Sequence, residues 1–193
     1  MKQNFAVFAL VACVVPPGHL VAQSPSEMRY SGWQRSQPAQ LGAFGPTVWI
    51  RMDTVGTWVL VPGSPAEVFR KTRHVYETMK LKAPLVDSTG GILGNPGFKH
   101  TGAMAGARMS TWIRCGEGMT GPNADTWRIT MALLSSVERV SNDTTRLRTV
   151  IVSTASNLAE GGRTPMPCTS TGQLEAQIHS KVRAMPPAPG GNE

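Results

Sequence analysis

Residues 126–155 read TWRITMALLSSVERVSNDTTRLRTVIVSTA, and this stretch decides the fold. Its first half alternates, so that four apolar residues share one face of an extended chain: Trp127, Ile129, Met131 and Leu133. Its second half, from Thr145 on, is rich in β-branched residues, and SNDT at 141–144 is typical of a turn. The stretch therefore predicts an antiparallel hairpin of two strands with one apolar face.

A helix is predicted before this hairpin, over residues 64–79. Ser64 can cap the helix, Pro65 suits its first position, and Glu67 completes a capping box. The residues that follow at helical spacing make one largely apolar face: Val68, Phe69, Thr72, Val75, Tyr76 and Met79. Pro84 cannot continue a helix, so the helix ends before it.

The rest of the chain adds short strands and one more helix. Strands are expected at residues 47–52, 57–61, 85–87, 92–93 and 108–115. Residues 53–56 could turn between the first two strands. Ser170 and Gln173 suggest a second capping box, before a short amphipathic helix that runs to Met185. This order predicts an α+β domain, an antiparallel β-sheet with two amphipathic helices packed on one face.

The N-terminus is typical of an export signal. Lys2 precedes an uninterrupted apolar run over residues 5–15, which is shorter than the roughly 20 residues of a membrane-spanning helix. We predict a signal peptide over residues 1–23. Cleavage after Ala22 would release a soluble protein, whereas LVAC ending at Cys13 resembles a lipobox, whose cysteine would be lipidated. We favour soluble export, and the lipid tether stays open.

Export predicts the periplasm or cell surface of a bacterium, with an outer-membrane anchor as the alternative. Residues 24–46 are rich in Ser, Gln, Pro and Gly and are predicted to be a flexible linker. A single α+β domain is expected over 47–185, and residues 186–193 are expected to form a disordered tail.

The chain is basic, with a formal net charge of +7 over 193 residues. Its Lys and Arg residues are scattered and never form a run of five. This pattern indicates a solvated basic surface and argues against nucleic acid as a partner. Contact with anionic lipid headgroups or wall polymers remains an alternative.

Two cysteines, Cys115 and Cys168, lie in the body of the chain. In an oxidising compartment we expect them to form a disulfide. The alternative is a reactive thiol, with His74, His100 or His179 as its base. His74 and His179 are expected on solvent-facing helical surfaces.

The segment GEGMTGPNAD at 116–125 is the most unusual stretch. Backbone amides in Gly-rich loops can hold an anion, but the Lys of a phosphate-binding loop is missing. We favour a structural loop and keep four residues as candidate polar contacts: Glu117, Thr120, Asn123 and Asp125. The His, Cys and carboxylate residues are too widely spaced to predict a metal site, and no cofactor is expected.

Residues 58–98 have a recognisable order. A strand runs into VPGSPAEVF at 61–69, a helix follows, and KAPLVDSTGGILGN at 82–95 includes the pattern Asp-x-x-x-Gly-Ile. This resembles the strand–helix–strand opening of helix-grip domains in bacterial envelope lipoproteins of the NlpB (BamC) type. As a whole, the chain resembles the members of an exported bacterial protein family. The resemblance implies a helix-grip-like two-layer sandwich with an accessory role in the envelope and no catalytic residues.

Together these features predict an exported, non-enzymatic envelope protein that acts as a protein-binding or assembly module. Its partner would be another envelope protein or a second copy of the chain. One alternative is a carrier of a small hydrophobic ligand between helix and sheet, lined by Tyr76, Trp112, Trp127 and Met131. The other is a thiol-dependent enzyme.

Overall fold

The structure is a computed structural model, which describes residues 36–40, 47–51, 56–159 and 165–186. The predicted signal peptide with Cys13, most of the predicted linker and nearly all of the predicted tail lie outside these residues. Within the described residues, no helix is both long enough and apolar enough to span a membrane.

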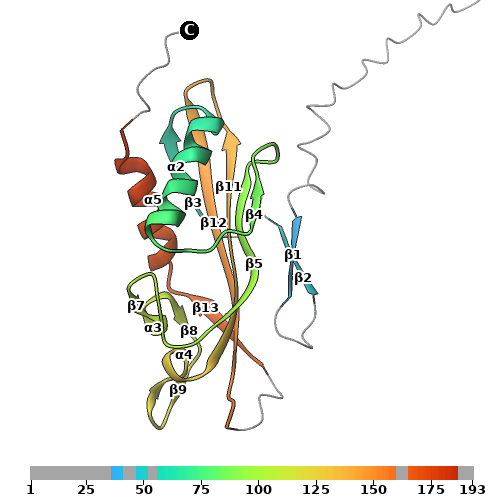
Figure 1. Cartoon of the computed structure of the whole chain (residues 1–193), viewed down its shortest axis with the longest axis vertical. Helices are drawn as coiled ribbons and strands as arrows, with labels where there is room; N and C mark the ends of the chain where they lie inside the picture. The colour runs from blue at the N-terminus through green and yellow to red at the C-terminus, as the bar shows by residue number, and fades with distance from the viewer. Residues whose placement is uncertain (1–35, 41–46, 52–55, 160–164, 187–193) are drawn as a thin grey trace, which may run out of the picture.

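The described chain is built on one antiparallel sheet (Figure 1). Its strands follow the spatial order β4-β5-β11-β12, and β12 is then flanked by β3 along one half and by β13 along the other. Strand β8 extends the sheet beyond β13. The bounds are β3 (Thr57–Pro62), β4 (Leu85–Asp87), β5 (Ile92–His100), β8 (Ile113–Arg114), β11 (Arg128–Arg139), β12 (Thr144–Ser156) and β13 (Met166–Ser170).

The central hairpin is confirmed. Strands β11 and β12 pair along their whole length, from Arg128 opposite Ser156 to Arg139 opposite Thr145. The odd-numbered residues of both strands face the main core, which contains Ile129, Met131, Leu133, Val137, Leu147 and Ala155. Even-numbered residues of the same strands face the other side, where Ala132, Leu134 and Val150 form a smaller cluster with Ile92. Strand β11 is thus buried on both faces for most of its length.

Two long helices, α2 (Pro65–Thr78) and α5 (Gln173–Ala184), lie side by side on one face of the sheet (Figure 1). This arrangement confirms the predicted α+β fold. Helix α2 begins as expected, because the Ser64 side chain accepts a hydrogen bond from the Glu67 amide at 3.3 Å. Helix α5 does not use the predicted capping box: Gly172 stands at its N-cap, with φ at 79°. The Thr171 hydroxyl accepts a hydrogen bond from the Gln173 amide at 3.3 Å instead.

Short elements fill the chain between β5 and β11: β6 (Ala103–Met104), β7 (Ala107–Arg108), α3 (Met109–Trp112), β8, β9 (Glu117–Gly118), β10 (Gly121–Pro122) and α4 (Asn123–Thr126). The strand predicted over 108–115 is wrong, because one helical turn interrupts it. Asp125 explains the turn: its carboxylate accepts hydrogen bonds from the backbone amide and the hydroxyl of Ser110, both at 2.8 Å. These bonds satisfy donors at the start of α3.

The first two predicted strands are present but do not pair with each other. Strand β2 (Thr47–Arg51) pairs with β1 (Ser36–Gln40), whereas β3 pairs with β12. The expected turn at 53–56 therefore does not join two paired strands. Strand β1 falls inside the stretch 24–46, and its backbone lies next to β5 (Figure 1).

Candidate functional site

The predicted disulfide between Cys115 and Cys168 is confirmed, with the two Sγ atoms 2.04 Å apart. Cys115 follows β8 and Cys168 lies within β13, and these two strands also pair through Thr169 and Arg114. The bond occupies both sulfur atoms, so a thiolate nucleophile at either residue would first require reduction. The structure therefore favours the structural role for these cysteines.

A hollow of about 400 Å³ lies between the Gly-rich loop and residues 110–115 beside the disulfide. Glu117 lines this hollow, and Thr120 is exposed near the tip of the loop. The other two candidate contacts hold the loop itself. Asn123 is buried and donates from Nδ2 to the Cys115 carbonyl at 3.2 Å, while Asp125 is bonded to Ser110. Glu117 and Thr120 are therefore accessible to a ligand. Asn123 and Asp125 instead fix the backbone around the loop.

A chain of buried polar side chains links both helices to the sheet. The Tyr76 hydroxyl of α2 hydrogen-bonds with Ser135 of β11 at 2.9 Å, and Ser135 bonds with Thr149 of β12 at 2.9 Å. His179 Nε2 of α5 bonds with the same threonine hydroxyl at 3.1 Å. Glu175, one turn before His179, is also buried and accepts a hydrogen bond from the Ser170 hydroxyl at 2.6 Å.

His179 is buried, so the prediction that it faces solvent is wrong. His74 is exposed as predicted. The buried face of α5 is wider than its apolar residues indicate, because Glu175 and His179 lie beside Leu174 and Ile178. A signal for this was available in the sequence. The two polar residues are four apart, and each immediately follows an apolar residue of the helix, so both lie at the border of the apolar stripe.

Burial keeps the Tyr76 phenol and the His179 imidazole of this network neutral. It raises the pKa of Tyr76 well above its ordinary value, an effect that the Ser135 hydrogen bond partly offsets and the nearby Glu175 reinforces. Burial also lowers the pKa of His179 to about 4. The phenol and the imidazole are therefore both uncharged at neutral pH, which suits a structural hydrogen-bond network.

We expect acid to destabilise the protein through His179. The unfolded chain, with an ordinary histidine pKa of 6.5, binds a proton more readily than the folded chain, whose pKa is about 4. Stability contributed by neutral His179 is therefore complete above pH 6.5 and is lost as the pH falls toward 4. Allowing for partial access of water to the ring, the loss is about 1–2 kcal/mol. Urea unfolding of the wild type and His179→Gln at pH 7 and pH 4.5 measures it.

The variant should lose less stability between these two pH values than the wild type. His74→Gln is the matched control, since His74 is an exposed histidine on the other helix. Its pH dependence should follow the wild type. Equal pH dependence in the wild type and His179→Gln would contradict the prediction.

Two large apolar side chains are exposed together on the sheet face opposite the helices. Trp58 is 53% exposed and Leu60 is 43% exposed, both on β3. On the neighbouring strand, Arg146 lies directly opposite Leu60 and places its guanidinium carbon 5.2 Å from the Trp58 ring centroid. Arg146 also pairs with Glu138 of β11 at 3.4 Å. We call Trp58, Leu60 and Arg146 the Trp58 patch.

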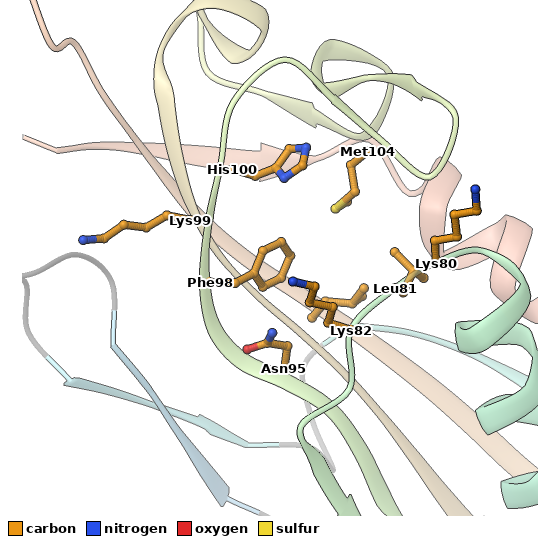
Figure 2. A pocket seen from close by; sticks show the side chains of 9 residues that line it. Lys80, Leu81, Lys82, Asn95, Phe98, Lys99, His100 and Met104 are labelled. Atoms are coloured by element: carbon orange, nitrogen blue, oxygen red, sulfur yellow. The ribbon is translucent and has the colours of Figure 1, made fainter.

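A cavity of about 260 Å³ lies between the segment after α2 and strand β5 (Figure 2). It is not lined by the residues expected for a ligand carrier. Of those, Tyr76, Trp112 and Met131 are buried in the main core, and Trp127 packs against it. The cavity is lined instead by Lys80, Leu81, Lys82, Asn95, Phe98, Lys99, His100, Met104 and Leu133.

No protein-family model and no curated protein matches this sequence. The assignment of a function therefore depends on the geometry of the chain itself. In the part of the chain that the structure describes, no three His, Cys, Asp or Glu side chains are grouped so that they could hold a metal ion.

Proposed function

We propose that this chain is an exported, non-enzymatic protein of the bacterial envelope that binds a protein partner through the Trp58 patch. The observation that carries the proposal is the exposure of Trp58 and Leu60 side by side on one strand. Tryptophan and arginine are the residues most enriched at the energetic centres of protein interfaces. The disulfide supports the compartment, because such bonds persist where the surroundings are oxidising.

The strand that carries the patch lies at the edge of the sheet. Among the described residues, β3 pairs only with β12. An edge strand presents backbone donors and acceptors on which a partner strand can add, and flanking side chains then provide specificity. The patch and the edge together favour a partner that contributes an extended apolar segment.

We expect the double variant Trp58→Ala/Leu60→Ser to weaken partner binding at least tenfold, since a buried Trp at an interface centre contributes about 2 kcal/mol or more. A photo-crosslinking residue at Pro62, which is exposed on β3 on the same face as Trp58 and Leu60, captures the partner in the native envelope. Mass spectrometry then identifies the captured partner. Sedimentation of the purified protein shows whether the partner is a second copy. The measurement is the yield of the specific crosslinked product with and without the double variant.

The matched control is Met119→Ser/Leu158→Ser, which removes two other exposed apolar side chains far from the patch in sequence. The control should give the same crosslinked product as the wild type. Equal yields from the wild type and the Trp58→Ala/Leu60→Ser variant would refute the proposal. Circular dichroism of both double variants verifies that each remains folded.

A second candidate function is supported by the 260 Å³ cavity, which lies between the end of a helix and the sheet. Leu81, Phe98, Met104 and Leu133 give it an apolar lining. Small-molecule sites are typically concave and mostly apolar, with a few polar groups that orient the ligand. The cavity thus favours a carrier of a small ligand as the alternative to a purely protein-binding module.

A further inference from the structure

The cavity beyond helix α2 combines an apolar floor with a basic rim (Figure 2). Leu81, Met104 and Leu133 are almost fully buried, and Phe98 is partly buried against the same core. The Trp112 indole donates a hydrogen bond to the Met104 carbonyl at 2.8 Å, which holds the wall formed by β6. An apolar group of a ligand could therefore rest on rigid, packed side chains.

The way α2 ends places two lysines at the rim. The Leu81 amide donates to the Tyr76 carbonyl at 2.8 Å, and the Lys80 amide donates to the Glu77 carbonyl at 3.0 Å. This is a Schellman motif, in which glycine usually occupies the left-handed position. Here Lys80 occupies it, with φ at 56°. The motif turns the chain so that Lys80 and Lys82 both border the cavity while Leu81 packs beneath it.

The charge around the cavity is positive and unbalanced. Lys80, Lys82 and Lys99 line it together with His100, and no Asp or Glu is among the lining residues. Within the residues that the structure describes, none of these three lysines forms an ion pair. Figure 2 shows Lys82 reaching toward the cavity, whereas Lys99 extends away from it on the other side of β5.

Asn95 supplies a neutral donor at the same place. Its Oδ1 accepts a hydrogen bond from the Gly97 amide at 3.1 Å, which fixes the orientation of the side chain. The Nδ2 group is then left to donate to a ligand. The His100 ring donates to the Ala103 carbonyl and so joins the wall to β5.

We propose that this cavity binds a small amphiphilic acid, with its carboxylate at Lys80, Lys82 and the Asn95 amide and its apolar part on Phe98, Met104 and Leu133. The inference deepens the second candidate function, the ligand carrier, and is independent of the Trp58 patch. A volume of about 260 Å³ holds roughly nine non-hydrogen atoms at the volume that liquid water gives each molecule. This size fits a fatty acid of about seven or eight carbons, whose carboxylate lies at the rim, or a simple aromatic acid.

Titration with octanoate, followed by NMR of the ¹⁵N-labelled protein, tests the proposal. We expect saturable shifts of the Asn95 side-chain amide and of the Trp112 indole N–H, with a Kd of about 0.1–1 mM for a ligand of this size. Octanol, which has the same chain without the charge, should bind at least fivefold more weakly. Inorganic phosphate alone should leave the indole signal unshifted.

Two variants remove the basic rim without disturbing the floor. Lys82→Ala should weaken octanoate binding about three- to fivefold, the range for a partly exposed charge pair. Lys80→Gly should weaken it by a similar factor while raising the Tm by about 2–4 °C, because glycine suits the left-handed position. Loss of binding in a more stable protein cannot be attributed to misfolding. Lys181→Ala is the matched control and should bind octanoate as the wild type does, because Lys181 is an exposed lysine of α5 that does not line the cavity.

These experiments distinguish specific binding of an acid from the more general function of a ligand carrier, on which the acid site rests. Equal binding of octanol and octanoate, or unchanged binding by Lys80→Gly and Lys82→Ala, would overturn the acid specificity while a ligand carrier remained. No saturable shift with octanoate at 10 mM, at least tenfold above the expected Kd, and none with octanol up to its solubility limit would overturn both. Binding by the Trp58→Ala/Leu60→Ser variant should equal that of the wild type.

Discussion

Replacing Cys115 and Cys168 together with alanine is expected to lower the free energy of unfolding by about 4 kcal/mol. The bond joins residues 53 positions apart, so it removes much of the freedom of the unfolded chain between them. That segment contains β9, β10, α4 and the whole hairpin β11–β12. The loss would be a large part of the 5–15 kcal/mol that stabilises a typical domain. Urea unfolding of the variant and the wild type at pH 7 measures it.

Reduction provides the control for this effect. A reductant should bring the unfolding midpoint of the wild type close to that of the Cys115→Ala/Cys168→Ala variant and leave the variant itself unchanged. The packing around Cys115, which is buried in the main core, is nearly preserved by alanine. Equal stability of the oxidised wild type and the variant would show that the disulfide contributes little.

Gly94→Ala is expected to destabilise the protein by about 3–5 kcal/mol, the range of severe backbone and packing defects. Gly94 lies in β5 with φ at 142°, opposite Leu134 of β11. A Cβ atom there would lie 2.2 Å from the Leu133 carbonyl oxygen and 2.9 Å from the Leu134 Cα. Both are backbone atoms of a strand that is buried on both faces, so neither can move aside cheaply. Thermal and urea unfolding measure the loss.

Gly102→Ala is the matched control for this prediction. Gly102 also has a positive φ, at 85°, but a Cβ added there would meet no atom within 4 Å. Its substitution should therefore cost only the backbone strain, about 1 kcal/mol. Similar losses in the two variants would mean that φ alone, and not the close approach of β5 to β11, explains the requirement for glycine at residue 94.

The central hairpin and helix α2 could be predicted because their signals are local. Alternation from Trp127 to Leu133 marks a strand, and Ser64, Pro65 and Glu67 mark a helix start, whatever the rest of the chain does. The pairing of β3 was not predictable in this way. Strand β12 is long enough to pair with both β3 and β13, and a sequence pattern does not show which distant strand takes that place.

The candidate sites also differ in whether the sequence could predict them. The disulfide followed from cysteine number and expected compartment. The Trp58 patch and the basic cavity did not, because each brings together side chains from separate elements. Trp58 and Arg146 meet only through the pairing of β3 with β12, and Lys82 and Phe98 meet only because the chain after α2 returns along β5.

The sequence by itself determined the class of fold, the positions of the hairpin and of both long helices, and the cysteine pair, since each depends on periodicity, capping or composition. Only the tertiary structure decided which strand lies at the edge, which polar residues of α5 are buried, and where a basic rim meets an apolar floor. The physical reason is that burial and charge at these places come from residues that lie far apart in the chain. These residues bury one another, and their charges combine, only after the sheet has brought them together.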